Sequence, residues 1–307
     1  MVIDTVPVLV VGFNRPDHLK TLLESIAVSP PKVLLCALDG PRLGNSSDEL
    51  LVRDCREVVE EMNIDSEIVI RFRENNLGLR GSIVDAVDWA CEKYGKVIVL
   101  EDDVQIGPNL IDFLEHGLNR YEQRDDIAHI NGYNLVPSSE LTDASSAFRT
   151  TRYIESYAWA TWERAWRKYD DSMTWGANVS LKELSSITGG YVSAVKWKLN
   201  FADALSERID TWAYRWMSTI WSERKIVLSP NANLVNYLGQ TSGTHTRLKT
   251  RWQELPVSSD LIRLDETIVP MEIDEAADQW LKLHVFDESL LGIAKGLAAS
   301  AILRFVK

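Results

Sequence analysis

Three consecutive carboxylates, Glu101, Asp102 and Asp103, directly follow an apolar run and have the clearest capacity for chemistry. Carboxylates at the end of a buried strand repel one another and resist desolvation unless a cation neutralises them, and their oxygens suit Mn²⁺ or Mg²⁺. Adjacent side chains of an extended chain point to opposite faces, so only one or two of the three can reach one ion. We expect Asp103 to be the direct ligand, with Glu101 supporting the site from behind. The alternative is a solvated acidic turn that ends a strand.

Polar segments follow each of four apolar runs that we predict to be strands buried on both faces. The runs lie at 8–11, 33–38, 68–70 and 97–100, and none alternates as a half-exposed strand does. Amphipathic helices are predicted near 19–26, 51–62 and 82–94, which is typical of an α/β fold with a parallel sheet. Ligands of such sheets bind beyond the carboxyl ends of the strands. The polar segments should therefore meet at one edge; they are 12–16, 39–41, 75–78 and 101–103.

The residues in these segments resemble those of glycosyltransferases of the GT-A fold. Glu101-Asp102-Asp103 is similar to the metal motif of the N-acetylglucosaminyltransferase that begins complex N-glycans, and residues 7–16 are similar to the opening strand of bacterial relatives. The resemblance implies a mixed, mostly parallel central sheet flanked by helices, with an acceptor-side C-terminal half. It also implies transfer of a sugar from a nucleoside-diphosphate sugar, a UDP-sugar being favoured, to a hydroxyl of a glycan or lipid-linked glycan, with Mn²⁺ or Mg²⁺ as cofactor.

The resemblance also implies which residues bind the donor. Asp102 would face the ribose or a metal-bound water, and either Arg15 or Arg80 would add positive charge for the phosphates. The positions that match the nucleotide pocket of the family are Phe13, Asn14, Arg15, Asp39, Asn76 and Gly78.

A second similar block starts at Asp210 and continues through 227–230 and 239–246. In the family, an Asp before a Trp at the start of a helix is the base of an inverting transfer, which matches Asp210. The apolar pattern after it predicts a helix near 213–220, whose N-terminus would keep the carboxylate ionised. Alternatively, Asp210 only caps that helix and Glu163 is the base. A retaining transfer also stays open, because sequence gives no distances between carboxylates.

His245 lies in a loop rich in Gly, Ser and Thr. It is a candidate second metal ligand in a loop that closes over the diphosphate, and the alternative is an ordinary surface histidine. Ten of the eleven tryptophans come after residue 151, and most should lie in the core. By resemblance to the aromatic block of bacterial relatives, Tyr157, Trp159 and Trp212 are expected at the acceptor.

The chain divides by pattern into three parts. Residues 1–135 form the expected nucleotide-sugar-binding half, 136–286 the acceptor-binding and catalytic half of the same domain, and 287–307 a C-terminal amphipathic helix. Residues 136–151 have little periodicity and read as a long mobile loop. The C-terminal helix is expected either to lie on a membrane or to pack on the domain or a partner subunit, so a homo-oligomer stays open.

Composition narrows the classes of function. Lys and Arg number 33 against 45 Asp and Glu, giving a net charge of −12, the wrong sign for a nucleic-acid partner. The cysteines at 36, 55 and 91 read as buried thiols in a reducing compartment, and no export signal or spanning helix is visible. We therefore expect a cytoplasmic protein, with the inner face of the plasma membrane as its place of peripheral contact.

Three rival functions remain to be weighed. A non-catalytic carbohydrate-binding relative would lose the base or the metal carboxylates, and both are present in this chain. A sugar-nucleotide pyrophosphorylase should carry a Gly-rich loop with Arg and Lys after the first strand, which residues 12–16 do not match. A dinucleotide-binding protein is disfavoured because no Gly-rich fingerprint follows that strand.

Overall fold

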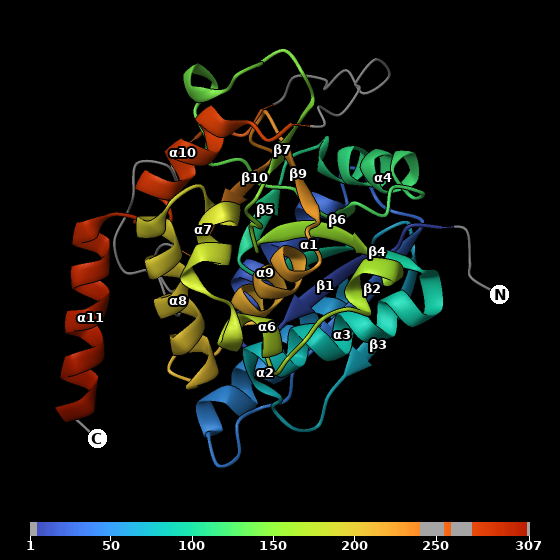
Figure 1. Ribbon diagram of the computed structural model, residues 1–307. Helices are drawn as coiled ribbons and strands as arrows, with labels where there is room; N and C mark the ends of the chain where they lie inside the picture. Colours follow the sequence, from blue (N-terminus) through green and yellow to red (C-terminus); the bar gives the residue numbers. More distant parts are fainter. Residues whose placement is uncertain (1–4, 240–254, 259–271, 306–307) are drawn as a thin grey trace.

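A mixed sheet of eight strands runs through the centre of the protein (Figure 1). The computed structural model describes residues 5–239, 255–258 and 272–305, with side chains up to residue 297. The strand order is β3-β2-β1-β4-β8-β6-β9-β7, and only β8 and β7 run against the direction of the other six. The expected mixed, mostly parallel α/β fold is thus confirmed. The strands of this sheet are β1 (Val8–Gly12), β2 (Val33–Leu38), β3 (Glu67–Phe72), β4 (Lys96–Glu101), β6 (Ile127–Asn131), β7 (Phe148–Thr151), β8 (Ala158–Trp162) and β9 (Ile226–Pro230).

The four predicted strands all exist, but they differ in burial. Strands β1 and β2 are buried at every residue, and β4 at every residue except Glu101, as unbroken apolar runs predict. Strand β3 is half-exposed, because it lies at the edge of the sheet and has a neighbour on one side only. The carboxyl ends of all four strands lie at one edge, where the polar segments begin.

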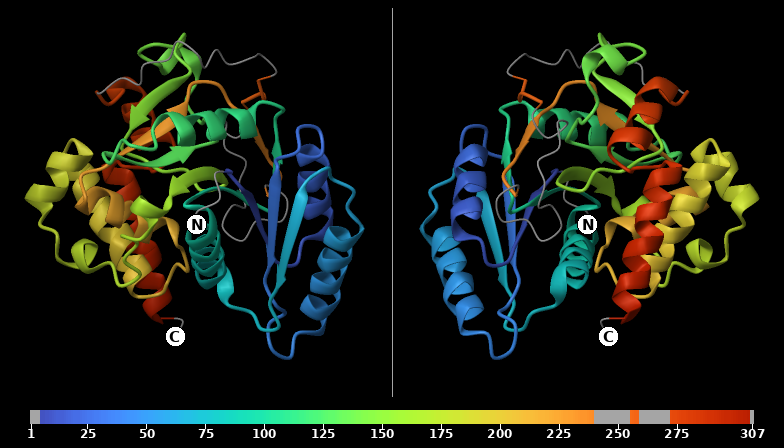
Figure 2. Two further views of the ribbon diagram at one scale, coloured as in Figure 1. Left: turned by 90° about the vertical axis from the view of Figure 1, so that its right-hand side faces the viewer. Right: turned by 90° about the vertical axis from the view of Figure 1, so that its left-hand side faces the viewer.

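Helices cover both faces of this half of the sheet. Figure 2 shows α1 and α2 on one face of β1, β2 and β3, and α3 on the other. Helix α1 starts with Pro16 at its first turn, where the fixed φ of proline suits a helix, and α3 ends at Gly95, which adopts a φ of 76°. These helices are α1 (Pro16–Ile26), α2 (Ser46–Glu61), α3 (Gly78–Tyr94) and α4 (Leu110–Arg120).

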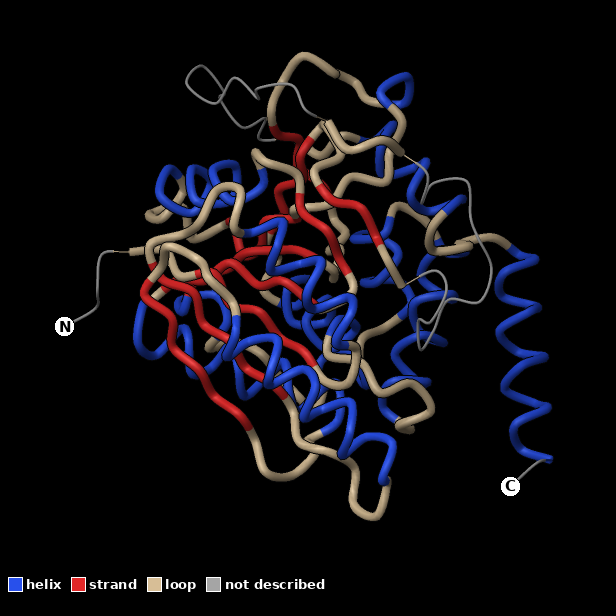
Figure 3. Tube along the Cα trace, turned by 180° about the vertical axis from the view of Figure 1, so that it is seen from behind, coloured by secondary structure: helices blue, strands red, loops and turns tan. Residues whose placement is uncertain are grey.

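The second half adds helices and a small two-stranded sheet. Strand β5 (Val104–Ile106) pairs antiparallel with β10 (Val235–Tyr237), directly after the carboxylates. Figure 3 shows the strands passing through the middle of the fold, with α11 at the margin, apart from them. The helices of this half are η1 (Ser138–Glu140), α5 (Glu163–Trp166), α6 (Thr174–Asn178), α7 (Leu181–Thr188), α8 (Tyr191–Leu205), α9 (Ala213–Ser222), α10 (Glu275–His284) and α11 (Leu290–Phe305).

The prediction of a long loop at 136–151 is wrong at its C-terminal end. Residues 148–151 form β7, which is buried along its length and pairs with β9 at the edge of the sheet. Sequence periodicity missed it because Arg149, Thr150 and Thr151 are polar, although each lies in the interior. The segment also includes the single turn η1.

The three cysteines are buried, as their apolar surroundings in the sequence predict. Cys36, Cys55 and Cys91 are buried free thiols, and burial raises the pKa of Cys36 to about 12. Within residues 5–239, 255–258 and 272–305, no helix has both the length and the apolar character needed to cross a bilayer.

Gly40→Ala should destabilise the fold, because the segments after β2 and β3 touch at this residue. A Cβ at Gly40 would lie 2.6 Å from backbone carbons of Glu74 and Asn75, which cannot move as a flexible side chain can. We expect a loss of about 2 kcal/mol in the free energy of unfolding, measured by urea denaturation. The matched control is Gly296→Ala in α11, where the nearest atom, Lys196 Nζ, is 3.9 Å away. Equal urea midpoints for the two variants would contradict this close contact.

Candidate functional site

The carboxylates after β4 are held by one arginine from the turn after β1. Arg15 donates from Nη1 to Asp102 Oδ1 at 3.2 Å and to Asp103 Oδ2 at 3.0 Å. The amide of Phe13 donates to the other oxygen of Asp102 at 3.1 Å. Both aspartates are only 7% exposed. Parallel pairing of β1 with β4 puts these two turns side by side, as their positions after the strands predicted.

Glu101 is set apart from the two aspartates and joins the second half of the chain. Its backbone amide donates to the carbonyl of Tyr157 at 3.1 Å, and hydrogen bonding with Trp212 favours its ionised form. Burial is nevertheless the largest influence, and together with the charges of Asp103 and Asp102 it raises the pKa of Glu101 well above its usual value. Glu101 therefore links β4 to residues of the second half of the chain.

The carboxylate cluster has fewer positive charges and donors than it needs. Asp103 Oδ1 and Glu101 Oε1 are buried and have no hydrogen-bond partner among the described residues. Burial, helped by the charge of Asp102 and opposed by Arg15, raises the pKa of Asp103 to about 6. These unpartnered oxygens fit a divalent cation, since carboxylate oxygens are its preferred ligands. In the part of the chain that is described, however, no three His, Cys, Asp or Glu residues surround a common metal position. The predicted second ligand, His245, lies outside the described residues.

Asp39 holds the segment after β3 in place. Its carboxylate accepts from the amides of Gly40 and Leu77 at 3.0 Å and from Asn76 Nδ2 at 2.9 Å. Asn76 in turn accepts from the amide of Gly78 at 3.2 Å. Burial raises the pKa of Asp39, although these backbone donors oppose the shift. The three residues are brought together at the edge where the predicted polar segments meet.

Asn14 belongs to a polar group that sequence reasoning missed. Asn14 Nδ2 donates to Asp48 Oδ1 at 2.9 Å, and Asp48 also receives Arg42 Nη2 at 2.9 Å. The guanidinium of Arg42 lies 5.5 Å from the centre of the Phe13 ring. Hydrogen bonding from Arg42 lowers the pKa of Asp48. In the sequence, Asp48 reads only as an acidic residue in the first turn of α2, so no signal marked it.

Asp210, from the second half of the chain, contacts residues of the first half. Its Oδ1 lies 3.6 Å from Arg80 Nε, and a Cβ added at Gly78 would lie 3.3 Å from its Oδ2. Arg80 also faces Asp171 at 3.5 Å and Glu207 at 3.4 Å. The two predicted site residues of 78–80 therefore meet the predicted base, whose side chain is 53% exposed.

The alternative role of Asp210 as a helix cap is wrong. Helix α9 begins at Ala213, and Trp212 in the N-cap position makes no side-chain cap. The amide of Ala213 is instead satisfied by the hydroxyl of Thr211 at 3.2 Å. The substitute base Glu163 is also misplaced, because its amide binds the carbonyl of Gly95 at the start of β4, the opposite edge of the sheet.

The three aromatic residues expected at the acceptor separate into two groups. Trp159 and Trp212 are 0% and 2% exposed and stack on one another with ring centroids 4.7 Å apart. They are core residues, so the expectation that their rings face an acceptor is wrong for this structure. Tyr157 is half-buried, and its ring lies 4.3 Å from that of Tyr237.

Tyr237 ends β10 and closes the site from a position that the sequence did not flag. It is paired with Val104, and the next amide, of Leu238, donates to the carbonyl of Asp103 at 2.8 Å. The backbone of Asp103 is thus fixed by the second half of the chain. In the sequence, residues 235–237 stand just before the block at 239–246, but three residues are too short a run to predict a strand.

Behind Tyr157 lies a row of buried polar residues. Asn131 donates to Ser229 Oγ at 2.8 Å and accepts the amide of Glu155 at 2.8 Å, and Arg149 is paired with Ser229 across β7 and β9. Both carboxylate oxygens of Glu155, and Nε and Nη2 of Arg149, have no partner among the described residues. Burial raises the pKa of Glu155 to about 8, and the charge of Arg149 lowers it.

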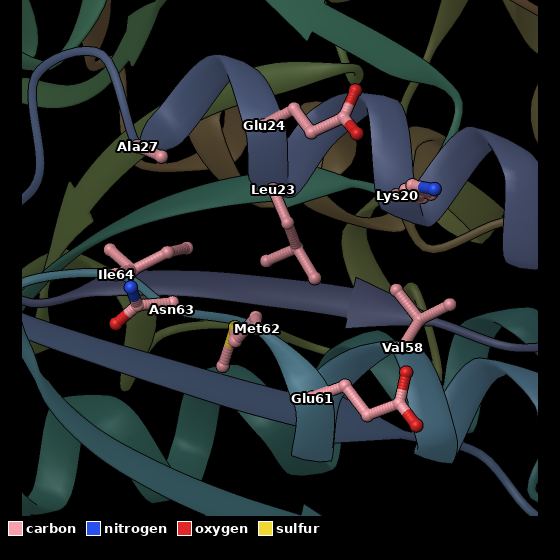
Figure 4. Close-up of a pocket in the computed structure, with 9 residues that line it drawn as sticks. All are labelled: Lys20, Leu23, Glu24, Ala27, Val58, Glu61, Met62, Asn63 and Ile64. Atoms are coloured by element: carbon pink, nitrogen blue, oxygen red, sulfur yellow. The ribbon is translucent and has the colours of Figure 1, made fainter.

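Two surface pockets lie away from the carboxylates at 101–103. One, of about 260 Å³, is formed between α1 and α2 by Leu23, Val58, Met62 and neighbours (Figure 4). Its residues Ala27 and Ile64 precede β2 and β3, so it lies at the amino ends of the strands. A second, of about 290 Å³, includes Lys225, just before β9, and lies at that same edge. Position beyond the carboxyl ends, with unpartnered buried carboxylates, marks the functional site better than pocket size does.

Glu155→Gln should remove part of the dependence of stability on pH. Because the folded-state pKa is about 8 and the ordinary value is about 4.3, the unfolded chain releases this proton first as the pH rises. The contribution of protonated Glu155 to the stability of the fold is complete below the ordinary pKa, and it is lost as the pH rises towards about 8. Between these values, wild-type unfolding free energy should fall relative to that of Glu155→Gln by up to about 1.4 kcal/mol per pH unit, measured by urea denaturation.

The control for this titration is Glu60→Gln, since Glu60 is an exposed residue of α2. That variant should follow the wild-type pH dependence throughout. Parallel curves for wild type and Glu155→Gln would refute the raised pKa of Glu155.

Comparison with known proteins gives a distant likeness. A scan against protein-family models finds no match. A curated relative from Arabidopsis thaliana, an alpha-1,3-mannosyl-glycoprotein 2-beta-N-acetylglucosaminyltransferase, is 22% identical over 191 residues, 57% of this chain. The match spans 42% of that relative, less than half its length. Among solved structures, a mannosyltransferase from Pyrobaculum calidifontis in complex with GDP-Man and Mn²⁺ aligns with a TM-score of 0.38 and 12% identity, covering 72% of this chain and 70% of that one.

Proposed function

We propose that the protein is a metal-dependent glycosyltransferase that moves a sugar from a nucleoside-diphosphate sugar to a hydroxyl of a glycan or lipid-linked glycan. The observation that carries the proposal is the buried cluster of Glu101, Asp102 and Asp103, which a single arginine neutralises in part. It lies at the carboxyl end of β4 in an α/β sheet. Asp210, which is distant in sequence, lies beside Gly78 and Arg80 of the segment that follows β3. The distant likeness to an N-acetylglucosaminyltransferase supports the same class. We take a UDP-sugar as the favoured donor, as the resemblance of the sequence motifs implies.

The donor side is proposed to bind the nucleotide through the turns after β1, β2 and β3. Asp103 would hold Mn²⁺ or Mg²⁺ through its unpartnered oxygen, and Asp102 would face the ribose. When bound, the divalent ion would neutralise the diphosphate that leaves. Arg15 contacts the two aspartates and opposes the rise in their pKa that burial causes. Asp39 holds Asn76 in place, which would lie with Gly78 beneath the donor.

Asp210 is proposed as the base. Its carboxylate is 53% exposed, and its Oδ1 lies 3.6 Å from Arg80 Nε. It would take the proton of the acceptor hydroxyl while that oxygen attacks the anomeric carbon from the side opposite the diphosphate. One displacement of this kind inverts the configuration. Tyr157, at the boundary between the two halves, is the proposed contact for the acceptor.

A non-catalytic glycan-binding relative is the second candidate. The observation that favours it is the engagement of Arg15 and Asp39 with neighbouring protein groups, which a purely structural role also explains. A binding protein would need neither the buried oxygen of Asp103 nor the half-exposed carboxylate of Asp210. The experiments below separate the two candidates.

One nucleoside diphosphate, added with Mn²⁺, should raise the temperature of unfolding of the wild-type protein. The proposal requires that one of UDP, GDP, dTDP and CDP gives a rise of about 5 °C at saturating concentration, and that the rise needs the metal. Asp103→Asn should abolish it, because the metal-binding oxygen is lost. Asp125→Asn is the control, since that side chain is 86% exposed and distant from the site. If no nucleotide stabilises the wild type, the glycan-binding candidate replaces the enzyme.

Asp210→Asn should lower kcat by about 10²-fold to 10⁴-fold, the range for loss of a general base, with little change in the donor KM. Release of the nucleoside diphosphate from the sugar nucleotide found above is the measurement. Glu207→Gln is a matched control, because Glu207 also faces Arg80 and is 73% exposed. Full activity of Asp210→Asn would exclude Asp210 as the base.

A further inference from the structure

We propose that Arg80 positions the carboxylate of Asp210 and does not bind the phosphates of the donor. Arg80 lies in the first turn of α3, and Asp210 belongs to the loop between α8 and α9. The inference rests on the proposed function, because it concerns the residue proposed there as the base. It replaces one of the two alternatives drawn from the sequence, in which Arg80 adds positive charge for the phosphates.

The three nitrogens of the Arg80 guanidinium face three different carboxylates. Nη1 lies 3.5 Å from Asp171 Oδ2, and Nη2 lies 3.4 Å from Glu207 Oε1. Nε lies 3.6 Å from Asp210 Oδ1. Because the guanidinium is a planar and rigid fork, the contacts of its two Nη atoms set the direction in which Nε points. Arg80 belongs to the first half of the chain, but its side chain is oriented by carboxylates of the second half.

One of these carboxylates, that of Asp171, is anchored by a buried side chain. Arg215, whose side chain is 4% exposed, donates from Nε to the carbonyl of Asp171 at 2.9 Å, and its Nε lies 3.3 Å from Asp171 Oδ1. Its Nη1 and Nη2 donate to the carbonyls of Thr211 at 3.1 Å and Ala204 at 3.0 Å, which lie on either side of Asp210 in the chain. Arg215 therefore fixes both Asp171 and the loop that carries Asp210.

The other oxygen of Asp210 lies against the backbone of the segment before Arg80. A Cβ added at Gly78 would be 3.3 Å from Asp210 Oδ2, so the carboxylate approaches a backbone that has no side chain at this point. The amide of Gly78 donates to Asn76 Oδ1 at 3.2 Å, which holds that backbone in place. Asp210 is thus confined at one oxygen by Arg80 and at the other by Gly78, while about half of its side chain faces water.

Orientation explains this arrangement better than stability does. The side chains of Asp171, Glu207 and Asp210 are 58%, 73% and 53% exposed, and ion pairs between exposed groups contribute little to stability. A base, however, must keep its oxygen within hydrogen-bond reach of the acceptor hydroxyl, and a displacement of about 1 Å can lower the rate by about 10²-fold. A contact that restricts the rotation of Asp210 therefore matters more for the rate than for the fold. The contact with Glu207 is the most exposed of the three and hence the most screened by salt.

Steady-state kinetics of Arg80→Gln tests the inference. We expect kcat to fall by about tenfold or more, with little change in the donor KM or in the rise of unfolding temperature that the nucleotide causes. Loss of a phosphate ligand would instead raise the donor KM and reduce that rise, because donor binding itself would weaken. Arg53→Gln is the matched control, since Arg53 also pairs with exposed carboxylates, those of Asp54 and Glu57 on α2. It should keep the wild-type kcat.

A second variant tests the same role without changing Arg80. Asp171→Asn weakens the anchor of the Arg80 guanidinium, so it should lower kcat in the same direction and leave the donor KM unchanged. Circular dichroism and the unfolding temperature without nucleotide compare the fold of each variant with that of the wild type. If Arg80→Gln does not fold, Asp171→Asn decides in its place, and an unchanged kcat of Asp171→Asn then overturns the inference.

A double-mutant cycle shows whether Arg80 acts through Asp210. In the Asp210→Asn background, Arg80→Gln should cause no further loss of kcat, because the group that it positions is already lost. Equal losses in the two backgrounds, an unchanged kcat of Arg80→Gln, or a raised donor KM would each overturn the inference and leave the proposed sugar transfer intact. A wild type without transfer activity, or full activity of Asp210→Asn, would overturn the proposed function or its base, and this inference with it.

Discussion

The ion pair between Arg15 and the adjacent aspartates 102 and 103 is the interaction on which the site depends. Three consecutive carboxylates would not stay buried at the end of a strand without compensation, because desolvation and mutual repulsion both act against them. One guanidinium touches two of them, and the amide of Phe13 satisfies a further oxygen. The compensation is incomplete, since buried oxygens of Glu101 and Asp103 have no partner among the described residues. That partial neutralisation leaves negative charge at the site without a compensating group among the described residues.

The two halves of the chain share this site because they share one sheet. Strand β8 pairs with both β4 and β6, so the second half of the chain is joined to the strand that ends in the carboxylates. Each half also holds a residue of the other: Leu238 binds the backbone of Asp103, and Gly78 and Arg80 lie against Asp210. The two halves are therefore joined at this edge by one main-chain hydrogen bond, from Leu238 to Asp103, and by the side-chain contacts of Asp210.

Local patterns allowed much of the first half to be predicted, and little of the second. Unbroken apolar runs located β1, β2, β3 and β4, and the rule that ligands lie beyond the carboxyl ends of strands located Asp39, Asn76 and the carboxylates. Strand β7 was missed because three of its four buried side chains are polar, and partners distant in sequence, such as Pro230 and Glu272, accept hydrogen bonds from them. Asp48 gave no signal because it reads as an ordinary acidic residue of a first helical turn, and Tyr237 because its strand is only three residues long. The roles of Trp159 and Trp212 were mispredicted for a different reason. The sequence around a tryptophan does not show whether its ring faces a ligand or the core, and both of these rings are buried.

The strand order also constrains how the chain can fold. Strands β1 to β4 pair among themselves, so the sheet around Arg15 and the carboxylates needs only the first hundred or so residues. Strand β6 has neither neighbour until β8 and β9 exist, because both of its partners come later in the chain. During synthesis, the acidic end of β4 thus forms before the aromatic cover supplied by Trp159 and Trp212. A nascent chain must carry that incomplete sheet edge, exposed at β4, until β8 is made and pairs with it.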